Sequence, residues 1–168
     1  IYVFLICLLF VYLLLSAQYE SFILPLAVLI SLPIGIFGSL FFLYIFGLEN
    51  NIYAQVAMVM LIGLLGKNAI LIVEFAMHEQ SQGRTIVRAA ISGAIARFRP
   101  ILMTSFAFIA GLLPLMSASG AGAIGNRTIG TAAAGGMLFG TVFGIVIIPG
   151  LYVLFASLAS KKKSKNNK

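Results

Sequence analysis

The sequence predicts an all-α integral membrane protein, from two observations on composition and one on pattern. Hydrophobic residues make up 61% of the chain, charged residues make up only 9%, and the mean hydropathy is +1.11. A soluble domain carries about 25% charged residues. The apolar residues also gather into long runs, and an α-helix needs about 20 such residues to cross the hydrocarbon core of a bilayer.

Short polar or glycine-rich breaks divide the chain into five apolar runs. The breaks contain residues that begin or end helices. Ser21 and Asn51 are candidate N-caps, Gly47 is a candidate helix end, and the glycine-rich segment 117–128 is expected to form a loop. The predicted membrane-spanning helices are residues 1–17, 22–47, 52–77, 99–117 and 129–158.

The basic residues lie in clusters beside the apolar runs. The connector 78–99 carries four arginines, and residues 161–168 form a polar tail with five lysines. The loops expected on the opposite side, 48–51 and 118–128, contain a single arginine between them. Basic residues in short loops favour the cytoplasmic side of a membrane. The connector and the C-terminus are therefore predicted to be cytoplasmic, and the net charge of +7 does not indicate a nucleic-acid-binding protein.

The chain is apolar from Ile1 onward, with no basic region ahead of a short apolar core. This pattern does not predict a signal peptide. We expect the chain to be a piece of a longer polypeptide, with Ile1 on the outer side of the membrane. The single Cys7 has no partner for an intrachain disulfide and is predicted to be a small buried hydrophobe.

Residues 85–98 carry apolar side chains at helical spacing, with Arg84 and Arg88 on another side. This pattern predicts a short basic amphipathic helix in the cytoplasmic interface. Thr85 is a candidate cap, and Pro100 suits the first turn of the next span, where a missing N–H is tolerated. The segment either only joins two spans or transmits movement between them.

Lys67 is the most unusual residue in the chain, because it lies within the apolar stretch LIGLLGKNAILIVEFAMH (61–78). An unpaired charge at mid-bilayer costs about 2.5–3.5 kcal/mol on insertion scales. Glu74 is seven residues away, about 10 Å along a helix, which is too far for a direct ion pair. The chain has no Asp, and its other acids fall in loops or at the interface. Three explanations stay open: the anionic partner lies in another part of the protein, Lys67 is neutral, or a structural ion pair only fixes helix packing.

Thr104 is expected at nearly the same depth as Lys67 on the next span, and Arg97 precedes Thr104 by seven residues on the same helix face. If the two antiparallel helices pack together, these three side chains can line one polar track. The ordinary alternatives are that Thr104 bonds to its own backbone and that Arg97 anchors the helix at the interface. Asn68 and Glu74 are accessory candidates for the same site.

Two further patterns are better explained by packing. Glu74 and His78 are four residues apart and can form an anchoring pair near the interface. A row of glycines in the last span predicts close helix approach, at Gly136, Gly140 and Gly144. No paired Cys/His spacing, phosphate-binding loop or nucleophile–base motif is found. No catalytic residue, metal site or enzymatic activity is therefore predicted.

Two motifs carry a resemblance to a known family. GKNAILIVEFA (66–76) and RFRPILMTSFAFIAGLLPL (97–115) resemble the C-terminal membrane half of resistance–nodulation–division (RND) efflux pumps, of the acriflavine-resistance multidrug type. GAGAIGNRTIGTAAAGGM (120–137) and the YES turn (19–21) fit as well, so the resemblance covers nearly the whole chain. Such pumps have twelve spans in two similar halves. Residues 1–160 would then be spans eight to twelve of an all-α bundle.

The resemblance implies a function and partners. The family consists of secondary active transporters of the inner membrane that export drugs by proton antiport, which gives antibiotic resistance. They form homotrimers and act with a periplasmic adaptor and an outer-membrane channel. Lys67, Arg97 and Thr104 match its proton-relay residues, whose two aspartates belong to a fourth span in the N-terminal half. The proton would be the coupling ion, without another cofactor. The alternatives are an RND exporter of metal ions and a membrane structural or assembly module without transport.

Overall fold

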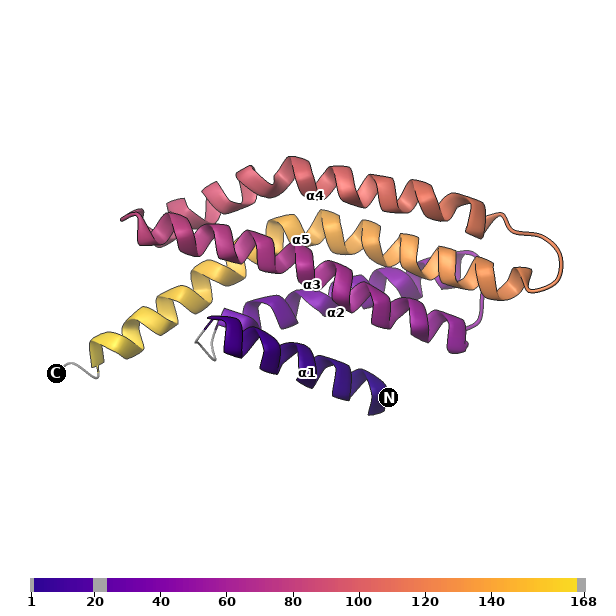
Figure 1. Cartoon of the computed structure of the whole chain (residues 1–168), viewed down its shortest axis with the longest axis horizontal. Helices are drawn as coiled ribbons and strands as arrows, with labels where there is room; N and C mark the ends of the chain where they lie inside the picture. The colour runs from indigo at the N-terminus through magenta and orange to yellow at the C-terminus, as the bar shows by residue number, and fades with distance from the viewer. Residues whose placement is uncertain (1, 20–23, 166–168) are drawn as a thin grey trace.

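The computed structural model describes residues 2–19 and 24–165, which form five α-helices and their connections (Figure 1). No strand occurs within these two ranges. The all-α prediction is therefore confirmed for this part of the chain. The helices are α1 (Tyr2–Tyr19), α2 (Leu24–Ile45), α3 (Ile52–Ser81), α4 (Ile86–Met116) and α5 (Ala123–Lys165).

Four of the helices are long and apolar enough to cross a membrane. Their spans are Leu26–Ile45, Ile52–Ser81, Ile86–Met116 and Ala123–Leu158. In α1 the apolar stretch is the shorter Leu5–Ala17. The 18 residues of α1 give a length of about 27 Å at 1.5 Å per residue. Four of the five predicted spans thus have suitable helices, and the first stays a prediction.

The connections and chain ends fall at two opposite ends of the bundle (Figure 1). The turn between α3 and α4 and the C-terminal end of α5 lie at one end. The start of α1, the α2–α3 connection and the α4–α5 connection lie at the other end. Successive helices therefore run antiparallel, as a chain that crosses a membrane repeatedly requires. The arginine-bearing α3–α4 turn and the lysine-rich end of α5 share one end of the bundle.

The predicted separate interfacial helix at 85–98 is wrong. Residues 86–116 form one continuous helix, with Pro100 inside it and not in its first turn. The small residues Ala89, Ala90 and Gly93 of this segment are buried, whereas its large apolar residues, such as Ile91 and Ile95, are exposed. A side-chain carbon on Gly93 would lie 2.9 Å from the backbone oxygen of Ile72 on α3. This contact with α3 holds residues 86–98 in one continuous helix with the rest of α4. It offsets the free energy that is lost with the backbone hydrogen bond that Pro100 cannot make.

Three other predicted boundaries are also shifted. The third helix runs four residues beyond the expected 77, and the last helix begins at Ala123 instead of 129. Gly125 lies inside α5 because it packs under the ring of Tyr53, which would be 3.0 Å from an added side-chain carbon. The last helix continues through Lys165, so the first part of the predicted basic tail is helical, and residues 166–168 lie outside the described residues.

The predicted helix ends are partly confirmed. The Asn51 side chain accepts a hydrogen bond from the backbone N–H of Ala54 at 3.1 Å, so it caps α3. Gly47 follows α2 with φ of +64°, a conformation that favours glycine. Thr85 occupies the N-cap of α4 without a side-chain hydrogen bond. Ser21 lies outside the described residues.

The core of the bundle is formed by α5 together with the helices around it, α2, α3 and α4. Small residues let α2 and α5 approach closely. Ser39 on α2 donates a buried hydrogen bond of 2.6 Å to the carbonyl of Ala132 on α5. One turn further along α5, a side-chain carbon on Gly136 would lie 2.6 Å from Ser39 Oγ and 2.8 Å from the carbonyl oxygen of Gly35. These contacts fix α5 against α2, on the side of the bundle where α5 also packs on α3 and α4.

Candidate functional site

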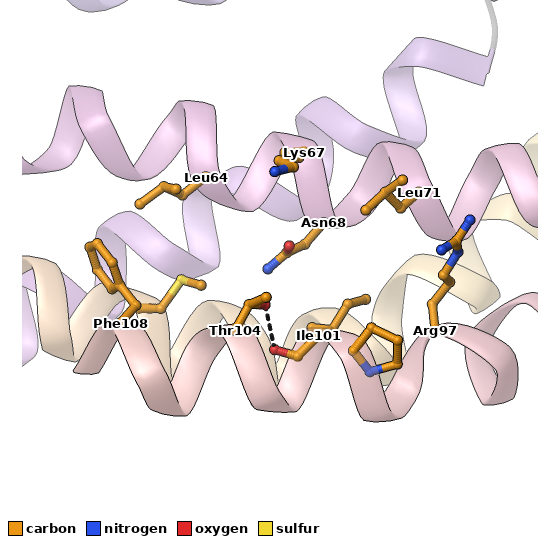
Figure 2. A pocket seen from close by; sticks show the side chains of 10 residues that line it. Leu64, Lys67, Asn68, Leu71, Arg97, Ile101, Thr104 and Phe108 are labelled. Atoms are coloured by element: carbon orange, nitrogen blue, oxygen red, sulfur yellow. Dashed lines mark hydrogen bonds between the residues drawn. The ribbon is translucent and has the colours of Figure 1, made fainter. Parts of the chain in front are cut away.

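A pocket of about 210 Å³ lies between α3 and α4 (Figure 2). Its polar side chains are Lys67 and Asn68 from α3 and Arg97 and Thr104 from α4. The other residues that line it are apolar. The structure therefore brings together the three predicted relay residues and one of the two accessory candidates.

The position of each residue follows from the helix that carries it. Lys67 is the sixteenth of thirty residues in α3, so it lies at the middle of a helix about 45 Å long. The antiparallel α4 places Thr104 and Arg97 along the same pocket. Those two residues are seven apart on one helix face, about 10 Å along its axis. The pocket thus extends from the middle of α3 toward the α3–α4 turn.

The polar groups of the pocket are mostly hydrogen-bond donors. Thr104 Oγ1 donates to the carbonyl of Ile101 at 3.0 Å, the local bond expected for a helical threonine. The Nδ2 of Asn68 and the Nε of Arg97 are buried and have no hydrogen-bond partner in the described part of the chain. The Arg97 guanidinium lies over the ring of Phe75, 5.6 Å from its centroid. Figure 2 shows the Asn68 side chain directed from α3 toward α4.

No acid among the described residues neutralises this pocket. The one ion pair between described side chains joins Arg84 and Glu79, with 2.6 Å between nitrogen and oxygen. Glu74 is exposed on α3 and does not line the pocket, and no hydrogen bond joins it to His78 in the described structure. The ring of His78 instead lies 3.1 Å from the side-chain nitrogen of Gln82.

The pocket is therefore suited to an anion, and to a carboxylate in particular. Lysine and arginine carry only donors, and arginine stays charged at all relevant pH values. A carboxylate between two such groups gains charge-assisted hydrogen bonds, which are about twice as strong as neutral ones. When the same carboxylate binds a proton, it becomes neutral and loses its ionic contacts with the two cations. Apolar surroundings favour this neutral form.

The surface of α3 around Lys67 is open on both sides. The Lys67 side chain is exposed on the described chain. It also lines a second hollow of about 330 Å³ between α1 and α3, next to Gly63 and Gly66. A side-chain carbon on either glycine would meet no atom within 4 Å. Within the described residues, the middle of α3 thus has the exposed Lys67 and Gly63 side by side with a hollow that no other side chain fills.

Sequence reasoning missed a polar cluster at the α3–α4 turn. Glu79 is buried and pairs with Arg84, which also donates to Ser92 Oγ at 2.8 Å. Close by in the sequence, the Gln80 side chain accepts a hydrogen bond of 2.7 Å from the buried Tyr152 of α5. The five-residue spacing from Glu79 to Arg84, across a turn at Gly83, is the sequence signal from which this pair could have been predicted. These contacts join the C-terminal end of α3 to α4 and α5.

Comparison with known proteins decides the family. A family model described as the AcrB/AcrD/AcrF family matches residues 1–156. The chain belongs to this family. Relatives include the toluene efflux pump membrane transporter TtgB of Pseudomonas putida, 46% identical over 95% of the chain. Another is the multidrug resistance protein MdtF of Escherichia coli K12, 44% identical over 94% of the chain. The chain spans only 15% of the length of each of these relatives.

Membership in the AcrB/AcrD/AcrF family confirms the predicted relationship to RND multidrug efflux pumps. The matches cover the two motifs, 66–76 and 97–115, on which the prediction depended. The roles of Lys67, Arg97 and Thr104 are not tested by this match and stay a prediction. The geometry adds that these residues share one pocket.

Proposed function

We propose that the chain is the C-terminal transmembrane part of a secondary active exporter in the cytoplasmic membrane. Residues 1–160 would form spans eight to twelve of that protein, and residues 161–168 its basic cytoplasmic end. The cargo would be drugs, solvents or other amphiphilic compounds, and protons would move in the opposite direction. The names of the relatives, which include toluene and multidrug transporters, support this cargo over metal ions.

The observation that carries the proposal is a pocket with donors from two helices and no acid among the described residues that line it. Lys67, Asn68 and Arg97 line it together, and the buried Nε of Arg97 has no hydrogen-bond partner among the described residues. We infer that carboxylates of the N-terminal half complete the site. When these carboxylates are charged, they pair with Lys67. When they are protonated, the pairing is lost and the helices that carry the partners can move apart.

Each residue has a distinct part in this mechanism. Lys67 senses the charge of the carboxylates, because its contacts with them change when they bind protons. Arg97 is held over Phe75 and keeps the potential positive on the side of the pocket toward the α3–α4 turn. The Thr104 hydroxyl donates its hydrogen to the carbonyl of Ile101. Its oxygen still has lone pairs that can accept a hydrogen bond from a protonated carboxyl. Proton binding can shift the balance between two conformations of the protein only if the contacts of these groups differ between the two conformations.

Transport driven by a proton gradient tests this function. The full-length transporter, reconstituted in liposomes, should export a fluorescent dye only when a pH gradient is imposed across the membrane. Each proton that crosses about 100 mV contributes roughly 2.3 kcal/mol, so a protonophore should reduce export to the leak of empty liposomes. The isolated 168-residue chain, as a control, should show only this leak. Export by the full-length protein that persists with the protonophore would contradict proton coupling.

We also propose an orientation, with the α3–α4 turn and the C-terminus in the cytoplasm. The basic residues gather at that end of the bundle, and the α4–α5 connection lies at the other end (Figure 1). In the full-length protein without Cys7, a membrane-impermeant maleimide added outside should label Ala121→Cys. Gln82→Cys should react only after the membrane is permeabilised. Labelling of both positions from the same side would rule out the proposed topology.

The partners proposed for the whole protein come from the family resemblance. They are the N-terminal half of the same polypeptide, two further copies in a homotrimer, a periplasmic adaptor and an outer-membrane channel. The open face of α3 around Lys67 supports the first of these, because an N-terminal helix would cover it. The mass of the purified full-length protein tests the trimer, and a monomeric mass would contradict it.

A further inference from the structure

A small cavity lies inside the bundle, where α2, α3, α4 and α5 meet. Its volume is about 10 Å³. Three of its lining residues are polar, namely Ser31, Asn68 and Thr141. A cavity of about 10–15 Å³ holds one water molecule if two to four polar groups surround it. Both the size and the lining of this cavity therefore match a single water.

The polar groups at this cavity keep unused hydrogen-bonding capacity. Ser31 Oγ donates to the carbonyl of Val28 at 2.6 Å, which leaves its lone pairs free to accept. Thr141 Oγ1 lies 2.8 Å from Ser105 Oγ, and one of the two hydroxyls donates to the other. Whichever of them donates, Thr141 can make one more hydrogen bond. Ser31, Ser105 and Thr141 are all buried, so bulk water does not supply these bonds.

Asn68 has the clearest requirement for a partner. Its Nδ2 is buried and makes no hydrogen bond to any residue that the structure describes. Buried polar groups are almost always bonded, either to protein or to an ordered water. An exchange of the amide nitrogen and oxygen would leave a buried acceptor in place of a buried donor, and a water molecule can serve either one.

We propose that this cavity binds one ordered water molecule, bonded to the Asn68 amide and to the hydroxyls of Ser31 and Thr141. Asn68 also lines the pocket that contains Lys67 and Arg97. The water therefore extends the polar groups of that pocket through Asn68 into the centre of the bundle, as far as α2 and α5. This site goes beyond the proposed function and does not depend on it, since the water binds whether or not transport is coupled to protons.

Gly144 gives a way to remove the water without disturbing its neighbours. This glycine is buried and lines the cavity, yet the nearest atom to an added side-chain carbon is Ile148 Cδ1 at 3.4 Å. A methyl group at Gly144 thus enters the cavity at ordinary contact distance. Gly140 is different, because a methyl group there would collide with Leu65. Alanine is also a better helix former than glycine, so Gly144→Ala should fold.

High-resolution structures of the full-length transporter test the proposal. The wild-type protein should show a water peak about 2.7–3.2 Å from the Asn68 amide. The peak should be absent in Gly144→Ala and present in Gly111→Ala, a matched change at an exposed α4 position with no atom within 4 Å. Asn68→Leu, which removes the amide and keeps a similar volume, should also lack the peak and serves if Gly144→Ala does not fold.

Two results would overturn the water site. One is a wild-type structure in which the Asn68 amide bonds to protein and no peak fills the cavity. The other is a peak that persists in Gly144→Ala or in Asn68→Leu. The outcome is separate from that of the proposed function. Gradient-driven export without this peak would remove only the water site, and the peak in a protein that exports without a gradient would remove only the proton coupling.

Discussion

Lys67→Ala in the full-length transporter should reduce drug efflux per inserted protein to the background of cells that lack the pump. In the proposed mechanism, the substitution removes the cation whose pairing changes when carboxylates of the N-terminal half bind protons. Removal of one partner from a buried ion pair costs about 3–5 kcal/mol, which is more than about 100-fold in an equilibrium constant. The unpaired carboxylates would also stay protonated, because burial disfavours their charged form. Efflux assays and quantification of inserted protein measure this effect.

Two companion variants make the result specific to the pocket. Lys67→Arg keeps the charge but changes its shape and hydration, so it should also impair efflux. Arg88→Ala removes an exposed cation of α4 that does not line the pocket, and its efflux should stay near that of the wild type. If Lys67 only fixes helix packing, Lys67→Ala should instead lower the amount of inserted protein and leave activity per molecule near normal.

Gly136→Val should have the largest effect on stability. The added side chain would collide with Ser39 Oγ and with the backbone oxygen of Gly35, where α2 and α5 approach each other. It would also weaken the adjacent hydrogen bond from Ser39 to Ala132. Overpacking of a core costs about 1–3 kcal/mol and occasionally more. We expect a lower melting temperature in detergent and less inserted full-length protein.

Gly111→Val is the matched control for this variant. Gly111 lies on α4 and is exposed, and an added side-chain carbon would meet no atom within 4 Å. Its melting temperature should therefore stay close to that of the wild type. Equal melting temperatures for Gly136→Val and Gly111→Val would mean that the α2–α5 contact does not limit stability.

The helices themselves could be predicted because their signals are local. Apolar runs of membrane-spanning length gave four spans that coincide with long apolar helices, and Asn51 marked the start of α3. Helix capping depends on residues within one turn, so the sequence contains it. The orientation rests on the arginines of 78–99 and the lysines after residue 160, and the structure gathers both at one end of the bundle.

The helix boundaries were predicted wrongly where tertiary packing outweighs the local conformational preference of the residues. Pro100 and the glycine-rich 117–128 both favour a helix end, yet the chain is helical at Pro100 and from Ala123 onward. Gly93 against α3 and Gly125 under Tyr53 supply contacts that no local pattern encodes. Helix propensity is a weak preference that tertiary contacts often override.

The candidate site was likewise predictable only in part. The shared pocket of Lys67, Arg97 and Thr104 was expected from depth and from seven-residue spacing, which are properties of single helices. The cavity beside Asn68 was not expected, because it needs Ser31 and Thr141 from two other helices. A cavity of one water's size depends on how four helices pack, and the sequence of one helix does not contain that information.

The distance from Lys67 Nζ to the nearest carboxylate oxygen, in a structure of the full-length transporter, tests the central claim most directly. We expect a carboxylate of the N-terminal half within about 4 Å of Lys67, in at least one state of the transport cycle, with the pair inside the protein. A Lys67 side chain that faces lipid, or only apolar groups and backbone, in every state would contradict it.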